Sequence, residues 1–167
     1  MWLDLSKIIE MPGARQPFRV TLDPERLSDP AISRFKLPPE AQGEVVNTAG
    51  LLTLRGTLKA DMTCVCDRCG TAYDREKVMT LEVPLAADVE GEASPEVFVL
   101  EGDGIDLDDV LETCFVLDME QKSLCRADCK GLCPQCGKNL NEGPCSCKKA
   151  LDPRLAALAS LLESEDE

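Results

Sequence analysis

Histidine is absent from this chain of 167 residues, and aromatic side chains make up only 4% of it. Without histidine there can be no Ser-His-Asp or Cys-His nucleophile, no HExxH zinc protease and no His-Glu zinc deaminase. The scarcity of aromatic residues means that a core must be built mainly from Leu, Val and Ala. The composition therefore excludes several large classes of enzyme before any motif is considered.

Long apolar segments are also missing. No run reaches the roughly 18 apolar residues that cross a bilayer, and Asp4 interrupts the stretch where a signal peptide would have its apolar region. We therefore expect no membrane partner and a cytoplasmic location. In a reducing cytosol, clustered thiols are metal ligands or redox groups more often than disulfides.

Basic residues are absent from residues 82–120, which hold 13 acids, and the whole chain has a formal net charge of −13. Residues 121–154 carry seven bases against three acids, and this basic segment is also the richest in Cys. The overall acidity predicts repulsion of a phosphate backbone. If zinc binds the thiolates, each Cys₄ site contributes a charge of about −2, which cancels much of the local basicity.

Alternation of apolar and polar residues predicts several half-buried strands. They are expected at residues 2–9, 18–22, 44–46, 51–66, 77–85 and 96–100. The long strand 51–66 and the strand 77–85 flank a CDRCG turn and form a hairpin, with Gly56 expected at a bulge or bend. The prolines between Arg26 and Gln42 predict turns or a short helix, and the acidic loop 86–96 is expected to be a solvated connection.

Residues 106–118 change to helical spacing, with Asp106 as the predicted N-cap and Cys114 as a core thiol. A second helix is predicted from Asp152-Pro153 through RLAALASLL, followed by an acidic tail. The predicted fold class is α+β: a strand-rich body with one or two helices and a Cys-rich, zinc-stabilised C-terminal appendage. The expected division is a body at 1–120, a Cys-rich segment at 121–150, and a short helix with its tail at 151–167.

Eight of the ten cysteines fall into four close pairs. The candidate metal ligands are Cys66, Cys69, Cys125, Cys129, Cys133, Cys136, Cys145 and Cys147. In the CDRCG and CPQCG turns, two intervening residues allow both sulfurs to reach one tetrahedral ion. The following glycine accommodates the positive dihedral that such a turn imposes. The spacing therefore predicts one or two structural Cys₄ sites.

Two arrangements of these thiols fit the spacing. In the first, Cys133, Cys136, Cys145 and Cys147 form a compact site, and Cys66, Cys69, Cys125 and Cys129 form a second site that fastens the appendage to the body. In the second, the two CxxCG turns share one ion, as in a zinc ribbon. Spacing alone does not separate the two, although the shorter closed loop favours the first.

Zinc in a structural role is the favoured metal ion. Tetrahedral sulfur also suits iron, which we consider the weaker alternative. A thioredoxin-like role for CPQC requires a βαβ context that the pattern lacks. A closed Cys₄ zinc site leaves no open coordination position, and the acidic stretch 101–112 does not meet EF-hand spacing. We therefore predict a non-enzymatic binding or assembly protein with no small-molecule substrate.

Four segments together resemble the bacterial YceD family, named for large-subunit ribosomal RNA accumulation, which has relatives in plastids. They are CDRCG after a long strand, the acidic IDLDDVLE helix, LCRADCKGLCPQCGKNLNEGPCSC, and DPRLAALASLL. The resemblance runs from about Leu52 to Leu162, and this chain is similar to the variety with a full set of C-terminal cysteines. Because some relatives lack these cysteines, the shared function is expected to lie in the body and its CDRC turn.

The resemblance implies a factor needed for 23S rRNA to accumulate and for the large ribosomal subunit to form. Two modes of action stay open: binding of rRNA or a pre-50S particle through a basic face, or binding of a ribosomal or RNA-processing protein by the acidic stretch 82–120. The candidate basic residues are Arg68, Arg126, Lys130, Lys138, Lys148 and Lys149. The alternative function is a zinc-thiolate redox sensor or adaptor unrelated to ribosomes.

Overall fold

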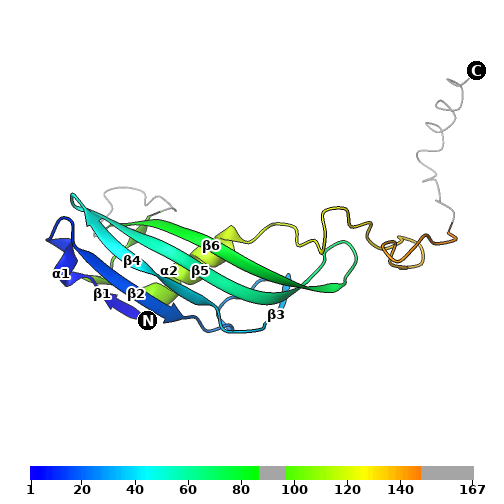
Figure 1. Ribbon diagram of the computed structural model, residues 1–167, viewed down its shortest axis with the longest axis horizontal. Helices are drawn as coiled ribbons and strands as arrows, with labels where there is room; N and C mark the ends of the chain where they lie inside the picture. The colour runs from blue at the N-terminus through cyan, green and yellow to red at the C-terminus, as the bar shows by residue number, and fades with distance from the viewer. Residues whose placement is uncertain (87–96, 148–167) are drawn as a thin grey trace, which may run out of the picture.

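A curved antiparallel sheet with one helix across it forms the body, and a Cys-rich segment extends beyond one end of the sheet (Figure 1). The computed structural model describes residues 1–86 and 97–147. The first strands of the main sheet are β2 (Arg15–Thr21), β3 (Ile32–Phe35) and β4 (Glu40–Thr48). The others are β5 (Leu51–Val65), β6 (Ala72–Ala86) and β7 (Phe98–Val99).

The order in this sheet is β2-β4-β5-β6-β7, and β3 pairs with β5 beyond the end of β4. All the pairs are antiparallel except β6 with β7, which is parallel. The β5–β6 hairpin is the longest element: its register runs without interruption from Leu52 opposite Leu85 to Val65 opposite Ala72. The hairpin thereby carries its turn, residues 66–71, well beyond the ends of β2 and β4 (Figure 1).

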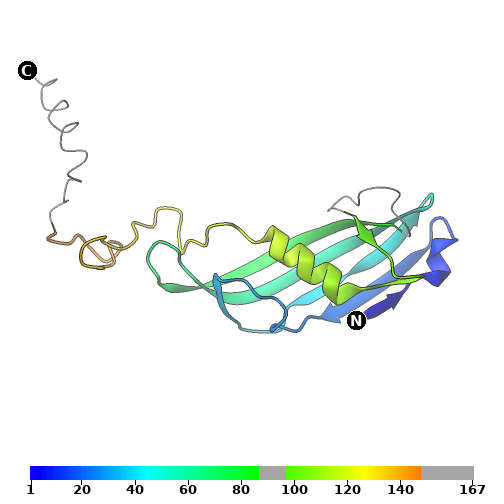
Figure 2. The ribbon, with the colours of Figure 1, turned by 180° about the vertical axis from the view of Figure 1, so that it is seen from behind.

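The remaining elements lie at the N-terminal side and over one face of the sheet. β1 (Trp2–Asp4) pairs with β8 (Gly104–Asp106) in a small second sheet, and α1 is Ser6–Ile9. Helix α2 (Leu107–Asp118) crosses one face of the main sheet (Figure 2). Its N-cap Asp106 accepts a hydrogen bond from the backbone N–H of Asp108 at 2.9 Å, as the sequence predicted.

One hydrophobic core fills the space between the sheet and α2. The even-numbered residues of β5 and the odd-numbered residues of β6 point into it, which follows from the two-residue period of a strand. The buried members on these strands are Leu52, Leu54, Leu58, Ala60, Met62, Cys64, Met79, Leu81, Val83 and Leu85. From α2, Phe115 is fully buried, and its ring centroid lies 6.1 Å from that of Phe35.

The predicted fold class is confirmed: the body is strand-rich, with two helices and C-terminal Cys clusters that could bind metal. The strands at 18–22, 44–46, 51–66 and 77–85 and the helix at 106–118 are all present. Cys64 is fully buried in the core, and Cys114 packs half-buried against it. The predicted helix that begins at Asp152 and nearly all of the predicted acidic loop 86–96 lie outside the described residues.

Three local expectations were wrong. Residues 2–9 are not one strand, because β1 ends at Asp4 and α1 follows. The proline-rich stretch contains turns, as expected, but no helix, and it also contains the strand β3, because the part between Pro30 and Pro38 can pair with the protruding end of β5. The strand expected at 96–100 spans only Phe98–Val99 in the described part.

A further expectation that was wrong concerned Gly56, where no bulge occurs. The β4–β5 register is continuous, and Gly56 faces Gly43 directly. A Cβ on Gly56 would lie 2.3 Å from the backbone oxygen of Gln42, and one on Gly43 would lie 2.1 Å from that of Arg55. The glycine pair is therefore required by close approach of the two backbones, not by an irregular register.

We predict that Gly56→Val lowers the free energy of unfolding by about 1–3 kcal/mol, because β4 and β5 must move apart to admit the side chain. The control is Thr57→Val at the next residue of the same strand, which keeps a β-branched side chain and should change stability much less. Urea denaturation measures both. Wild-type stability for Gly56→Val would contradict the close-approach explanation.

Candidate metal centres

The turn of the β5–β6 hairpin is a CxxCG loop whose backbone is held at both ends. Gly70 donates its N–H to the carbonyl oxygen of Cys66 at 2.8 Å, and Cys66 donates its own N–H to Thr71 at 3.0 Å. Gly70 has a φ of 67°, a conformation that glycine adopts without strain. The loop therefore directs the thiols of Cys66 and Cys69 to the same side.

The second CxxCG loop repeats this arrangement within the Cys-rich segment. Gly137, with a φ of 70°, donates its N–H to the carbonyl oxygen of Cys133 at 2.9 Å. Cys133 donates its N–H to Lys138 at 2.8 Å. Two segments far apart in the sequence thus form the same local structure, as their shared sequence pattern predicted.

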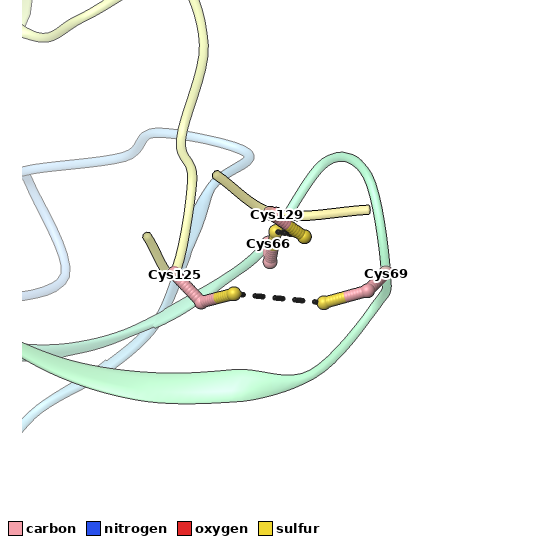
Figure 3. Close-up of side chains that lie close together, drawn as sticks. All are labelled: Cys66, Cys69, Cys125 and Cys129. Carbon is pink, nitrogen blue, oxygen red and sulfur yellow. Dashed lines mark hydrogen bonds between the residues drawn. The ribbon is translucent and has the colours of Figure 1, made fainter. Parts of the chain in front are cut away.

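The first centre combines the hairpin turn with the segment that follows α2. The Sγ atoms of Cys66, Cys69, Cys125 and Cys129 all lie within 4.8 Å of one another. Figure 3 shows the four side chains converging, with Cys66 3.8 Å from Cys129 and Cys69 3.7 Å from Cys125. Three of the four, all except Cys125, are buried. The two close pairs of this centre join residues that are 56 and 63 positions apart in the sequence.

The second centre lies entirely within the Cys-rich segment. The Sγ atoms of Cys133, Cys136, Cys145 and Cys147 also lie within 4.8 Å of one another, and Cys145 is 3.4 Å from Cys133. Only Cys133 is buried, and Cys136 is exposed. The eight thiols are therefore grouped in the first of the two predicted arrangements, and the two CxxCG turns do not share a site as they would in a zinc ribbon.

Backbone and side-chain hydrogen bonds reinforce the first centre. Asp67 donates its N–H to the carbonyl oxygen of Ser123 at 2.8 Å, and its carboxylate accepts the N–H of Ser123 at 2.6 Å. Arg68 accepts the N–H of Leu132 at 3.1 Å and donates from its guanidinium to the carbonyl oxygen of Cys129 at 3.0 Å. The tip of the hairpin thereby contacts the segment on both sides of Cys125 and Cys129.

The geometry of both centres fits a tetrahedral metal ion. A Zn–S distance of about 2.3 Å places the four sulfurs about 3.8 Å apart at the corners of a tetrahedron, close to the measured separations. A disulfide would need sulfurs about 2.05 Å apart, and all ten thiols are free. Two Cys₄ groups could therefore each hold a metal ion. That the ion is zinc stays a prediction.

Hydrophobic burial does not explain how the Cys-rich segment is held. Outside the body, the buried cluster consists of Cys66, Cys69 and Cys129, with Tyr73, Leu124 and Cys125 partly buried against it. Residues 121–147 contain no helix or strand, only the bridge between Leu132 and Asn139. Segments this small and this poor in apolar residues are stabilised by metals or disulfides, and here the thiols are positioned for a metal.

Backbone N–H groups in and around each CxxC loop lower the pKa of one of its cysteines. For Cys66, burial opposes ionisation, but N–H groups of Cys125, Cys69 and Arg68 donate to its sulfur and lower its pKa to about 6. Hydrogen bonds from Cys136 and Gln135 likewise lower the pKa of Cys133 to about 6. These donors stabilise the negative sulfur that a metal requires.

One thiol of each centre instead has a raised pKa. Burial, together with hydrogen bonding to Cys66, raises the pKa of Cys125 to about 12. Contact with Cys136, together with burial, raises the pKa of Cys147 to about 12. Four thiolates repel one another, so a cation is needed to ionise all four members of a group.

The candidate basic residues are less available than the sequence suggested. Lys130 is exposed, but Arg126 pairs with Asp128 at 3.5 Å and Lys138 donates to the carbonyl oxygen of Pro144 at 2.9 Å. Arg68 is exposed, but its guanidinium donates to the carbonyl oxygen of Cys129. Lys148 and Lys149 lie outside the described residues. That these six residues bind RNA or a partner stays untested.

Sequence reasoning missed the polar residues that surround the thiols. Asn141 donates to the sulfur of Cys129 at 3.3 Å and accepts the N–H of Lys130 at 2.8 Å. Tyr73, the only tyrosine, shares a 2.7 Å hydrogen bond with Ser123. A signal was present for Asn141, since Asn in a turn often accepts a nearby backbone N–H, but no pattern identified Tyr73 or Ser123.

The part of the chain that contains the two centres matches a known family. Residues 54–162 match the family described as "Large ribosomal RNA subunit accumulation protein YceD". This chain belongs to the YceD family. Both CxxCG turns, and with them all eight clustered thiols, fall within the part that matches the family.

Mycobacterial proteins align with the whole of this YceD chain. Proteins of Mycobacterium tuberculosis and Mycobacterium bovis, each described as uncharacterized, are 30% identical to it over 179 residues. The alignments cover 100% of this chain and 84% of each relative. No solved structure matches the chain. In the part of the YceD chain that the structure describes, no helix is both long and apolar enough to cross a bilayer.

For this YceD chain we predict two metal ions per molecule, and one after loss of a ligand from either centre. Native mass spectrometry of protein purified without added metal should show the mass of two zinc ions. Cys69→Ser and Cys145→Ser should each retain one. Cys64→Ser, a change at a fully buried thiol outside both centres, should retain two. Masses without bound metal, together with ten freely titratable thiols, would contradict the prediction.

Proposed function

We propose that this protein is a non-enzymatic cytoplasmic factor that supports accumulation of 23S rRNA and formation of the large ribosomal subunit. The match of residues 54–162 to the YceD family, which is named for accumulation of the large ribosomal RNA subunit, is the observation that supports this role. The site chemistry agrees with a factor that is not an enzyme, because four thiolates around one zinc leave no position open for water or substrate. Zinc acts here as a structural ion in both centres.

The charge of the Cys-rich segment favours a protein partner over direct contact with rRNA. Residues 121–147 contain four bases and two acids. Two Cys₄ zinc centres, each with a charge of about −2, outweigh the two extra bases, so this segment together with Cys66 and Cys69 of the hairpin is net negative. Phosphate contacts need several unopposed cations, and at least Arg126 and Lys138 already have partners in the protein. We therefore propose that the protein acts as an adaptor for a ribosomal or RNA-processing protein.

Direct rRNA binding is the second candidate, because exposed bases do gather near the centres. Arg68, Arg126, Lys130 and Lys138 are all exposed. Reversing the charge of Arg126, Lys130 and Lys138 together separates the two modes. An adaptor keeps its association with pre-50S particles after this change, whereas a protein that binds through these residues loses it.

We expect depletion of the protein to lower the ratio of 23S to 16S rRNA and to reduce 50S particles in a ribosome gradient, because the family description concerns the large-subunit RNA. Cells that express the wild-type chain from a second copy provide the control. A normal ratio and a normal gradient after depletion would leave a zinc-stabilised adaptor with no ribosomal role.

We expect the adaptor mode to show in a salt series. Pull-down of large-subunit ribosomal proteins should weaken as salt rises, because an acidic surface attracts basic proteins electrostatically. Gel-shift assays with 23S rRNA fragments should show no complex under the same conditions. A salt-sensitive gel shift that the triple charge reversal abolishes would instead establish the rRNA-binding mode.

A further inference from the structure

The outer edge of β6 is open over most of its length. β5 occupies the inner edge of β6 from Ala72 to Leu85. On the other side, β7 reaches only Leu85 and Ala86. Within residues 1–86 and 97–147, no strand pairs with the outer edge between Ala72 and Pro84. Alternate residues of such an edge direct their N–H and C=O groups outward, where an added strand can pair with them.

An apolar groove of about 310 Å³ lies beside this open edge. It is lined by Met79, Thr80, Leu81, Glu82, Val83, Phe98, Cys114, Leu117 and Asp118. Residues from both faces of β6 take part, so the groove follows the edge of the strand, and the C-terminal half of α2 supplies the other wall. Leu117 is 75% exposed there. An open edge next to pockets for alternate side chains is what strand addition requires.

The part of the edge between Lys77 and Pro84 lacks the features that normally prevent pairing. Edge strands are commonly protected by Pro, Lys or a bulge. Residues 78–83 contain no Pro or Lys, and their register with β5 is regular. Lys77 is only 9% exposed, because its Nζ donates to the backbone oxygen of Asp118 at 2.7 Å and pairs with the carboxylate at 2.6 Å.

Charge around the groove indicates what kind of segment fits. Glu82 and Asp118 line it, with side chains 70% and 51% exposed, and the lining contains no base. Arg55 pairs with Glu82 and Lys77 pairs with Asp118, but neither base lines the groove. Because both charged residues of the lining are acids, the groove attracts a basic segment and repels RNA. A second copy of the chain would bring the same acids against it.

We propose that the open edge of β6 binds an extended segment of a basic protein, which adds to the sheet as a strand and places its alternate apolar side chains in the groove beside α2. The Lys or Arg residues of that segment lie near Glu82 and Asp118. This inference rests on the proposed adaptor role, because it names the kind of partner and the surface that receives it.

Synthetic nine-residue peptides that alternate Lys with Val or Leu test this directly. Fluorescence anisotropy should show binding, and the same peptide with Glu in place of Lys should bind at least tenfold more weakly. A peptide with identical side chains but N-methylated at alternate backbone positions should lose binding, because it cannot pair with an edge. Amide hydrogen exchange should slow within residues 78–83 when the basic peptide is present. Equal binding of the three peptides, or no slowing on β6, overturns the proposal.

Two exposed leucines provide a matched pair of variants. Leu117→Gln changes the groove and should weaken peptide binding at least tenfold. Leu51→Gln changes a residue of similar exposure, 73% against 75%, that does not line the groove, and it should leave binding unchanged. Equal effects of the two variants overturn the proposal. So does a concentration-dependent dimer that occupies the edge and excludes the peptide.

Complementation of depleted cells separates this inference from the proposed function. If the edge receives the partner, Leu51→Gln restores 23S rRNA and Leu117→Gln does not. Full restoration by Leu117→Gln overturns the edge as the docking site and leaves the ribosomal role standing. If depletion leaves 23S rRNA unchanged, the ribosomal role is contradicted, and the peptide measurements alone decide whether β6 binds basic strands.

Discussion

The convergence of four thiols at the tip of the β5–β6 hairpin is the contact on which the shape of the chain depends. Cys66 and Cys69 come from the hairpin, and Cys125 and Cys129 come from the segment after α2. The small buried cluster there is formed by cysteines rather than by aliphatic side chains. Because hydrophobic burial contributes so little at this point, a metal ion bound by the four thiolates would supply most of the stabilisation.

The rest of the body positions this contact. Each strand of the hairpin spans 15 residues, which carries the CxxCG turn beyond the sheet. The apolar residues of β5 and β6 pack against α2, so the start of the Cys-rich segment is fixed relative to the hairpin. Arg75 and Lys77 of β6 pair with Glu120 and Asp118. These ion pairs hold the end of α2 and the residues that follow it against the hairpin. A Cys₄ cluster at the tip and an edge of β6 that is unpaired over most of its length are thus two consequences of one long hairpin.

Much of this arrangement could be predicted from residue spacing. The two-residue period of β5 and β6, the N-cap at Asp106 and the two CxxCG turns are local patterns, and each was found in the structure. The short strand β3 could not be predicted, because its pairing with the end of β5 depends on how far that strand extends past β4. The role of Gly56 was missed for a similar reason, since its partner Gly43 lies on another strand. Spacing also left the grouping of the thiols open, because only the folded hairpin brings residue 66 near residue 129.

The most direct test of this account is amide hydrogen exchange on the purified protein before and after chelation of its metal. Asp67, Ser123 and Leu132 donate the backbone hydrogen bonds that join the hairpin tip to the Cys-rich segment. The account predicts that their amides are protected in the metal-loaded protein and exchange rapidly after chelation, while the amides of β5 between Leu52 and Met62 stay protected. Equal protection of the three amides with and without metal would show that the segment is held by something other than the thiolate centres.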